Sequence, residues 1–341
     1  MKHTLRISLL FIGICFCQLS FSQSTNFWSA AKEKSIDKQS YAIQTNSTQV
    51  YQLDFDGLSR SIQSSGTKQM NVPLPDGRII SVTLSPSKIM SESLSKKYPN
   101  IRAYRATNED GISGMVDITH KGFHGFFYTP QGTVYIDPIN DKTTRQYQVY
   151  YRQDYLQKDI KLLENDIYDQ KGVKIKTKSN SKASSRTSGT ELRQYRLAIT
   201  ATGEYTQFHG GTVEDGLAAI VTTMNRVTGI YEREVSITFQ LIDDTDLLIF
   251  TDPNSDPYNN EAPDVYINQV QQNIDDIIGN ANYDIGHGFS TGAGGLAGAG
   301  PCITGQKATG VTGIANPIGD PFDVDFVAHE IGHQFSANHT F

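Results

Sequence analysis

The chain has 341 residues, enough for two domains of ordinary size that each bury a hydrophobic core. It carries 30 Lys and Arg residues against 36 Asp and Glu residues, a net charge of −6. From Leu197 onward three basic residues face 19 acidic ones, a net of −16, whereas the preceding part carries a net of +10. The acidic second half argues against nucleic acid as a partner. The opposite charges either favour docking of the two halves or reflect an acidic domain beside a basic linker.

The amino-terminal residues 1–22 have the pattern of a secretory signal peptide. Lys2 and Arg6 flank an apolar run from Ile7 to Phe16, and small residues stand at Ser20 and Ser22. No later stretch offers the roughly twenty apolar residues of a membrane span. We therefore expect an exported protein without a transmembrane segment.

Residues 23–170 are predicted to form a mostly antiparallel β domain. Short runs with period-two alternation are separated by turn signals such as Pro75-Asp76-Gly77. The clearest strand-like runs cover residues 48–54, 79–84, 114–118, 125–128 and 133–137. His120 and His124 flank a glycine in this strand-and-turn sequence, so we interpret them as structural or surface residues.

A basic, polar segment follows at residues 171–192. Between Lys171 and Arg196 eight basic residues face one acidic residue, Glu191, amid Ser, Thr, Asn and Gly. This composition is typical of an exposed linker, which is a natural site for proteolytic cleavage.

Residues 193–341 alternate between strand and helix patterns, which predicts an α/β domain with a mixed sheet. The expected order is a strand at 193–200, a helix at 213–231, strands at 235–242 and 247–250, and a helix at 263–278. Apolar residues spaced three and four apart predict the buried helix faces: Leu217, Ile220, Val221, Met224, Val227 and Ile230 in the first helix, and Val265, Ile267, Val270, Ile274, Ile277 and Ile278 in the second.

A glycine-rich stretch at residues 292–300 follows the second helix. It lacks the Lys-Ser or Lys-Thr of a phosphate-binding loop. It is either an edge strand whose small residues admit another backbone, or an irregular loop.

The last thirteen residues carry the chemistry. His329 and His333 are four apart, so on a helix both rings leave one face and can hold one metal ion, with Glu330 placed to act on a bound water. His339 comes six residues later, so the helix must end and the chain must turn before it. Upstream, Asp320 is the expected N-cap and Pro321 the first residue of this helix.

The pattern H-E-x-x-H-x-x-x-x-x-H resembles the metzincin signature, and residues 322–328 and 338–341 resemble the reprolysin (adamalysin-like) zinc metalloproteases, especially secreted bacterial members. The resemblance implies zinc held by His329, His333 and His339, with Glu330 as general base, so that His287 is not needed as a ligand. It also implies a substrate-binding edge strand, made here by Gly295, Leu296, Ala297 and Gly298. Residues 122–126 and 135–138 resemble the propeptide of such proteases, which predicts a zymogen.

Two features depart from this family's pattern. Ser336 stands where the family usually has Gly, and a positive φ there costs Ser on the order of 1 kcal/mol more than Gly. The sequence ends two residues after His339, before the Met-containing turn that metzincins carry. Cys302 does not depart from it: the resemblance implies that Cys302 is half of a disulfide whose partner lies beyond the active-site helix, and the alternative is a buried unpaired thiol. We therefore expect a truncated chain.

The sequence thus predicts a secreted zinc endopeptidase acting on proteins or peptides. No Cys lies between residues 23 and 301, which excludes a cysteine switch within that segment. Two alternatives remain: a non-catalytic, zinc-stabilised adhesion module, which would not need Glu330, and an inactive fragment of a protease. Calcium is a further candidate ion. Its ligands would be Asp243, Asp244, Asp246 and Asp252, although no EF-hand spacing is present.

Overall fold

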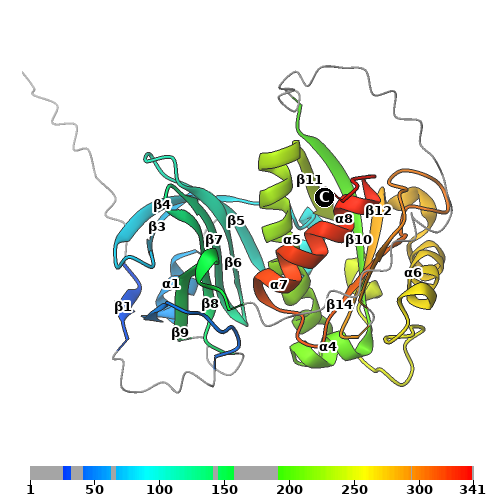
Figure 1. Ribbon diagram of the computed structural model, residues 1–341, viewed down its shortest axis with the longest axis horizontal. Coiled ribbons are helices and arrows are strands. Elements are labelled where there is room, and N and C mark those ends of the chain that lie inside the picture. Colours follow the sequence, from blue (N-terminus) through cyan, green and yellow to red (C-terminus); the bar gives the residue numbers. More distant parts are fainter. Residues whose placement is uncertain are drawn as a thin grey trace, which may run out of the picture.

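The computed structural model describes residues 26–31, 41–62, 67–140, 145–156, 191–292 and 294–339. The expected signal peptide at 1–22 and nearly all of the expected linker at 171–192 lie outside these ranges. Two lobes lie side by side, a β lobe built from the first half of the chain and an α/β lobe built from the second (Figure 1). No helix in the described part of the chain is long and apolar enough to span a membrane.

The β lobe is one nine-stranded sheet in the order β1-β2-β9-β8-β7-β6-β5-β4-β3, with every neighbouring pair antiparallel. All five strands expected from the sequence are present. The elements are β1 (Trp28–Ala30), β2 (Gln49–Leu53), α1 (Phe55–Ser61), β3 (Lys68–Pro73), β4 (Ile79–Pro86), α2 (Glu92–Lys97), β5 (Arg102–Thr107), β6 (Ser113–Thr119), β7 (Gly122–Thr129), β8 (Gly132–Pro138), β9 (Gln146–Tyr151) and the 3₁₀ turn η3 (Arg152–Asp154). Leu58 of α1 packs into the apolar face of the sheet, next to Val72 and Val116.

The α/β lobe contains the predicted mixed sheet. Its five strands are β10 (Arg193–Ala201), β11 (Ile237–Leu241), β12 (Ile285–Ser290), β13 (Gly294–Ala297) and β14 (Gly310–Gly313), in the order β11-β10-β12-β14-β13. The first four strands in this order are parallel, and β13 runs antiparallel to β14 at the edge.

Successive side chains along β10 point to opposite faces of the sheet, and a helix covers each face. Leu197 and Ile199 pack with α5 (Val213–Val235), whereas Ala198 packs with α6 (Pro263–Ile278). Both helices confirm the sequence prediction, and α5 starts with a capping box between Thr212 and Asp215. The buried face of α6 is narrower than the sequence predicted. It consists of Tyr266, Ile267, Val270 and Ile274, whereas Val265 and Ile277 are 42% and 39% exposed.

The prediction of a strand at 247–250 is wrong. The chain forms the 3₁₀ turn η4 (Thr245–Leu248) there, and only Ile249 makes an isolated bridge, to Ala201. The hydroxyl of Thr200 donates to the carbonyl of Leu248 at 2.8 Å, so a side chain takes a carbonyl that a strand ladder would use. The lobe also contains α4 (Gly203–His209) and the 3₁₀ turn η5 (Asn280–Asn282).

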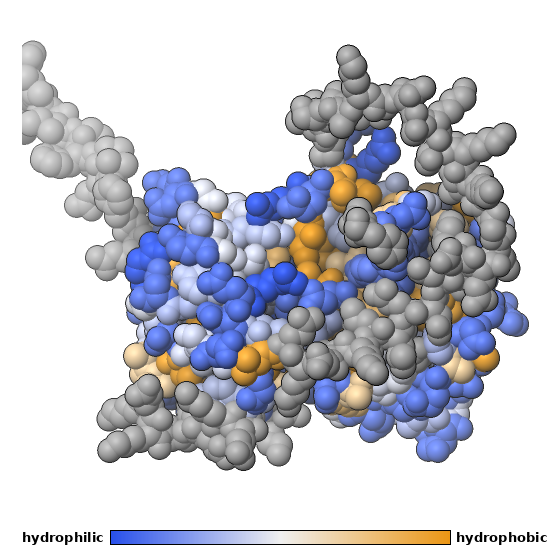
Figure 2. Space-filling model, viewed as in Figure 1, coloured by the Kyte–Doolittle hydropathy of each residue, from blue (hydrophilic) through white to orange (hydrophobic). Residues whose placement is uncertain are grey.

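The two lobes meet along α5. Hydrophilic side chains cover most of both lobes, and hydrophobic ones gather in the seam between them (Figure 2). Ile230 of α5 packs against Met115 and Phe126 of the β lobe. Polar contacts flank this cluster: His124 lies 2.9 Å from Asp117, and His120 lies 2.8 Å from Asp215 of α5. These two histidines therefore have the structural role expected of them.

Candidate metal centre

The site is built on one helical run formed by α7 (Gly319–Phe322), the π-helical turn η6 (Asp323–Ala328) and α8 (His329–Gln334). Its inner face is fully buried through Phe322, Phe326, Val327 and Ile331. The hydroxyl of Tyr231 on α5 donates to the carbonyl of Ala328 at 2.7 Å, immediately before the first histidine. A π-helical turn interrupts the regular i→i+4 bonding and is frequent at functional sites.

The expected start of this helix is only partly right. Helix α7 begins at Gly319, and Asp320 lies within it without capping it. The carboxylate of Asp320 is used by the β lobe instead, where it accepts hydrogen bonds from the hydroxyl of Tyr135 and, at 2.8 Å, from Nε of Arg152. The long-range partners of Asp320 thus override its local capping tendency.

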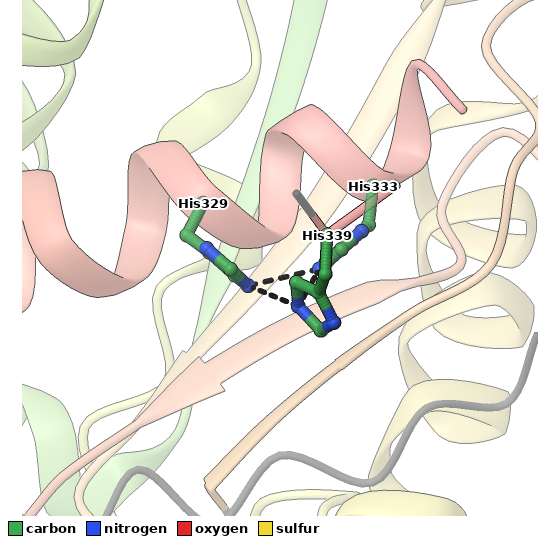
Figure 3. Close-up of side chains that lie close together, drawn as sticks. All are labelled: His329, His333 and His339. Atoms are coloured by element: carbon green, nitrogen blue, oxygen red, sulfur yellow. Dashed lines mark hydrogen bonds between the residues drawn. The ribbon is translucent and has the colours of Figure 1, made fainter. Parts of the chain in front are cut away.

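The ring nitrogens of three histidines converge next to α8 (Figure 3). Nε2 of His333 lies 2.8 Å from Nε2 of His329 and 3.0 Å from Nε2 of His339, and the third pair is 3.1 Å apart. Four-coordinate zinc with Zn–N distances of about 2.0–2.1 Å holds neighbouring nitrogens roughly 3.3 Å apart. The donor set and its spacing therefore fit a zinc ion.

One histidine also has its tautomer set by the backbone. Nδ1 of His333 lies 2.8 Å from the carbonyl oxygen of Ala337. A carbonyl only accepts hydrogen bonds, so Nδ1 carries the proton and Nε2 keeps its lone pair for a metal. Metal-binding histidines typically have such a partner.

The turn that brings in His339 begins where α8 ends. The amide of Ala337 donates to the carbonyl of Gly332 at 3.0 Å, and the amide of Ser336 donates to that of His333 at 2.8 Å. This is the hydrogen-bond pattern of a Schellman motif, in which the residue at Ser336 takes a left-handed conformation. Ser336 has φ of 66°, so this position does need the positive φ that glycine adopts more easily.

Glu330 lies against Gly295 of the edge strand β13. Its side chain is buried, with the residue 2% exposed. A Cβ atom added to Gly295 would lie 2.0 Å from Oε1 of Glu330 and 2.1 Å from the ring of Phe326. Only glycine allows the strand to approach the carboxylate this closely. Leu296 and Ala297 complete β13, and Gly298 follows it.

A buried polar cluster that the sequence did not indicate fixes α8 against the sheet. Nδ1 of His287 on β12 lies 2.8 Å from Oε1 of Gln334, and Nε2 lies 2.8 Å from the hydroxyl of Thr312. Burial lowers the pKa of His287 to about 4, so the ring is neutral. Nε2 of Gln334 donates to the carbonyl of Gly286 at 2.8 Å. No local signal marks this cluster, because its members come from three distant segments.

Buried charges hold the start of the helical run. The guanidinium of Arg226 donates to Asp323 at 2.8 Å and to Asp137 of the β lobe. Burial raises the pKa of Asp323 to about 6, although Arg226 opposes this rise. The hydroxyl of Thr223 also donates to Asp323, at 2.6 Å.

Two further possibilities raised by the sequence gain no support. Among the described residues only the three histidines bring three His, Cys, Asp or Glu side chains together, so the acids considered for calcium form no such group. Asp246 instead pairs with Lys97 and accepts from Tyr98, and Asp252 accepts hydrogen bonds from Asn254 and Ser255. Cys302 is free and exposed, so the buried-thiol alternative is wrong.

A comparison with known families matches part of the second half of the chain. Residues 217–340 match the family model described as Metallo-peptidase family M12B Reprolysin-like. This segment is therefore a reprolysin-like metallopeptidase domain.

Comparison with solved structures returned, among others, metalloproteinase-II from Bacteroides fragilis, with 10% sequence identity and a TM-score of 0.47 over 84% of this chain and 85% of that one. A comparison with curated protein sequences found no match.

We predict that Ser336→Gly stabilises the protein by about 1 kcal/mol, because glycine adopts the left-handed conformation at no steric cost. Ser336 is exposed, so the substitution changes little except the backbone preference. Urea unfolding measures the change, and Ser336→Ala is the control, since alanine keeps the Cβ atom and should bring no comparable gain. Equal stability of all three proteins would show that the backbone at 336 is not strained.

Proposed function

We propose that the chain is a secreted zinc-dependent endopeptidase made as a zymogen, with Glu330 as its general base. The observation that carries the proposal is the convergence of three Nε2 atoms within 3.1 Å of one another, on the helix that also carries Glu330. In this proposal His329, His333 and His339 hold the metal. The metallopeptidase family of residues 217–340 supports a peptide or protein as substrate.

The chain's own residues have separate tasks in the reaction. His329, His333 and His339 would hold the zinc ion, which would supply a Lewis acid for activating water and polarising the scissile carbonyl. Glu330 accepts a proton from the attacking water and passes it to the leaving amine. An extended substrate pairs with β13, where Gly295, Leu296, Ala297 and Gly298 offer main-chain groups at the edge of the sheet. The Schellman turn at Ser336 keeps His339 opposite the two helical histidines.

The amino-terminal parts give the proposed zymogen its organisation. Residues 1–22 act as signal peptide, 23–170 as propeptide domain, 171–192 as linker and 193–341 as catalytic domain. Contacts from Asp137, Tyr135 and Arg152 to α5 and to the start of the active-site helix support a β lobe that docks on its own catalytic domain. The signal-like residues 1–22 support export, and the resemblance to secreted bacterial proteases supports a bacterial source.

Glu330→Gln is expected to lower proteolysis at least about 100-fold while zinc remains bound, because the amide cannot accept the proton and the three histidines are unchanged. We would measure hydrolysis of fluorescent casein by the full-length protein, before and after limited cleavage of the linker, with and without a zinc chelator. Zinc-loaded protein that is inert with either residue would contradict the proposal and favour a binding module.

Gly295→Ala is expected to lower activity by about 100-fold with zinc content unchanged, because the new methyl group forces Glu330 and Phe326 to move, and a shift of about 1 Å can cost that much. Gly332→Ala is the matched control, since a Cβ atom added there meets nothing closer than the hydroxyl of Tyr231 at 3.5 Å. Melting curves of both variants check that they fold. Wild-type activity in Gly295→Ala would mean that the carboxylate position does not matter.

A further inference from the structure

The segment from Ser87 to Ile101, here called the anchor segment, leaves the β lobe between β4 and β5 and packs into the other lobe. It begins after Pro86, the last residue of β4, and returns at Arg102, the first residue of β5. Its helix α2 is capped by the hydroxyl of Ser91, which accepts from the amide of Leu94 at 3.2 Å. The segment therefore has its own local structure at a position where a hairpin turn would suffice.

The anchor segment extends the sheet of the α/β lobe, here called the metallopeptidase half; the β lobe is the first half. Strand β11 is the edge opposite to β13. The amide of Leu241 on β11 donates to the carbonyl of Ile89 at 2.7 Å, and Met90 forms a parallel bridge with Leu241. Backbone groups that would otherwise lie at an open sheet edge are thus paired with the first half of the chain.

Apolar side chains of the anchor segment belong to the core of the metallopeptidase half. Ile89 is 1% exposed, Leu94 0% and Ile101 2%, and all three lie in the cluster that contains Val221 and Phe239. Outside this cluster Lys97 pairs with Asp246, and the hydroxyl of Tyr98 donates to the same carboxylate at 3.0 Å. One element from the first half thus completes both the sheet and the core of the second.

The other contacts between the lobes include several ion pairs. Arg226 with Asp137, Arg152 with Asp320 and Arg105 with Glu232 all cross the seam. The attraction in such pairs is largely offset by the loss of hydration, and the more exposed pairs are weakened by salt. Burial of the apolar side chains of the anchor segment carries no comparable cost from lost hydration of charges.

We propose that the anchor segment holds the first half of the chain on the metallopeptidase half as a two-chain complex after the connection between Leu156 and Glu191 is cut. Cutting the connection then does not by itself free the metallopeptidase half. Removal of the first half requires a second event that breaks or digests the anchor segment. The proposal rests on packing and hydrogen bonds alone, so it stands even if the metal centre proves inactive.

The test is to place a site for a sequence-specific protease within residues 171–190 of the full-length, Glu330→Gln protein, and to cut it after folding. Gel filtration at low micromolar concentration should recover both fragments in one particle of unchanged size, also in about 1 M salt, where the Debye length is roughly 3 Å. Fragments that separate at once, or a larger particle formed by exchange of anchor segments between copies, would overturn the proposal.

Variants of α2 then locate the anchor. Leu94→Ala should weaken the cut complex about 100-fold, the effect of truncating a buried leucine. Glu92→Ala is the control on the same helix, because that side chain is 84% exposed, and it should leave the complex unchanged. Equal affinity in Leu94→Ala and the parent protein, or release by Arg105→Ala alone, would overturn the proposal.

A second measurement does not depend on the folding of a variant. The amide of Leu241, bonded to Ile89, should be as protected from hydrogen exchange in the cut protein as in the uncut one. Loss of that protection on cutting would show that the anchor segment leaves, and would contradict the proposal.

Discussion

The buried guanidinium of Arg226 is the contact on which the arrangement of the two lobes depends. It is 2% exposed and lies between Asp323, the first residue of the π-helical turn η6, and Asp137, on β8 of the β lobe. Its geometry therefore couples α5, the π-helical turn and the β lobe. Replacing such a buried ion pair with apolar residues often leaves the stability unchanged, whereas removing one partner leaves an unpaired buried charge. The cluster therefore fixes one geometry more than it adds stability.

The far end of the same helical run is fixed by different physics. Hydrogen bonds of the Schellman turn and the bond from His333 to Ala337 involve adjacent residues, so the third histidine is positioned locally. The clamp of His287 on Gln334 then ties this end to the sheet. Between the two ends, Glu330 is held against Gly295 at the edge strand. The candidate metal site and the adjacent carboxylate are thus carried by a helix held at both ends.

Local patterns in the sequence predicted the parts of the fold that depend on neighbours along the chain. The apolar spacing gave α5 and α6, the interval between His329 and His333 gave two rings on one face, and the interval to His339 required a turn. The Gly that the resembled family usually has in place of Ser336 raised the question of a positive φ there, and φ is 66°.

Contacts between distant segments were beyond such patterns. Asp320 has the local features of a helix cap, yet its carboxylate bonds to Tyr135 and Arg152. From the sequence alone, the anchor segment is indistinguishable from an ordinary connection between strands. Its apolar residues pack into a core formed by residues from Leu197 onward, which no local pattern indicates.

The most direct test of the metal centre is X-ray absorption of the purified full-length protein, combined with its zinc content. The account predicts one zinc per chain bound by three imidazole nitrogens at about 2.0–2.1 Å and one further light ligand, with one imidazole lost in His339→Ala. A protein that binds no zinc, or binds it equally well and with the same ligands without His339, would contradict it.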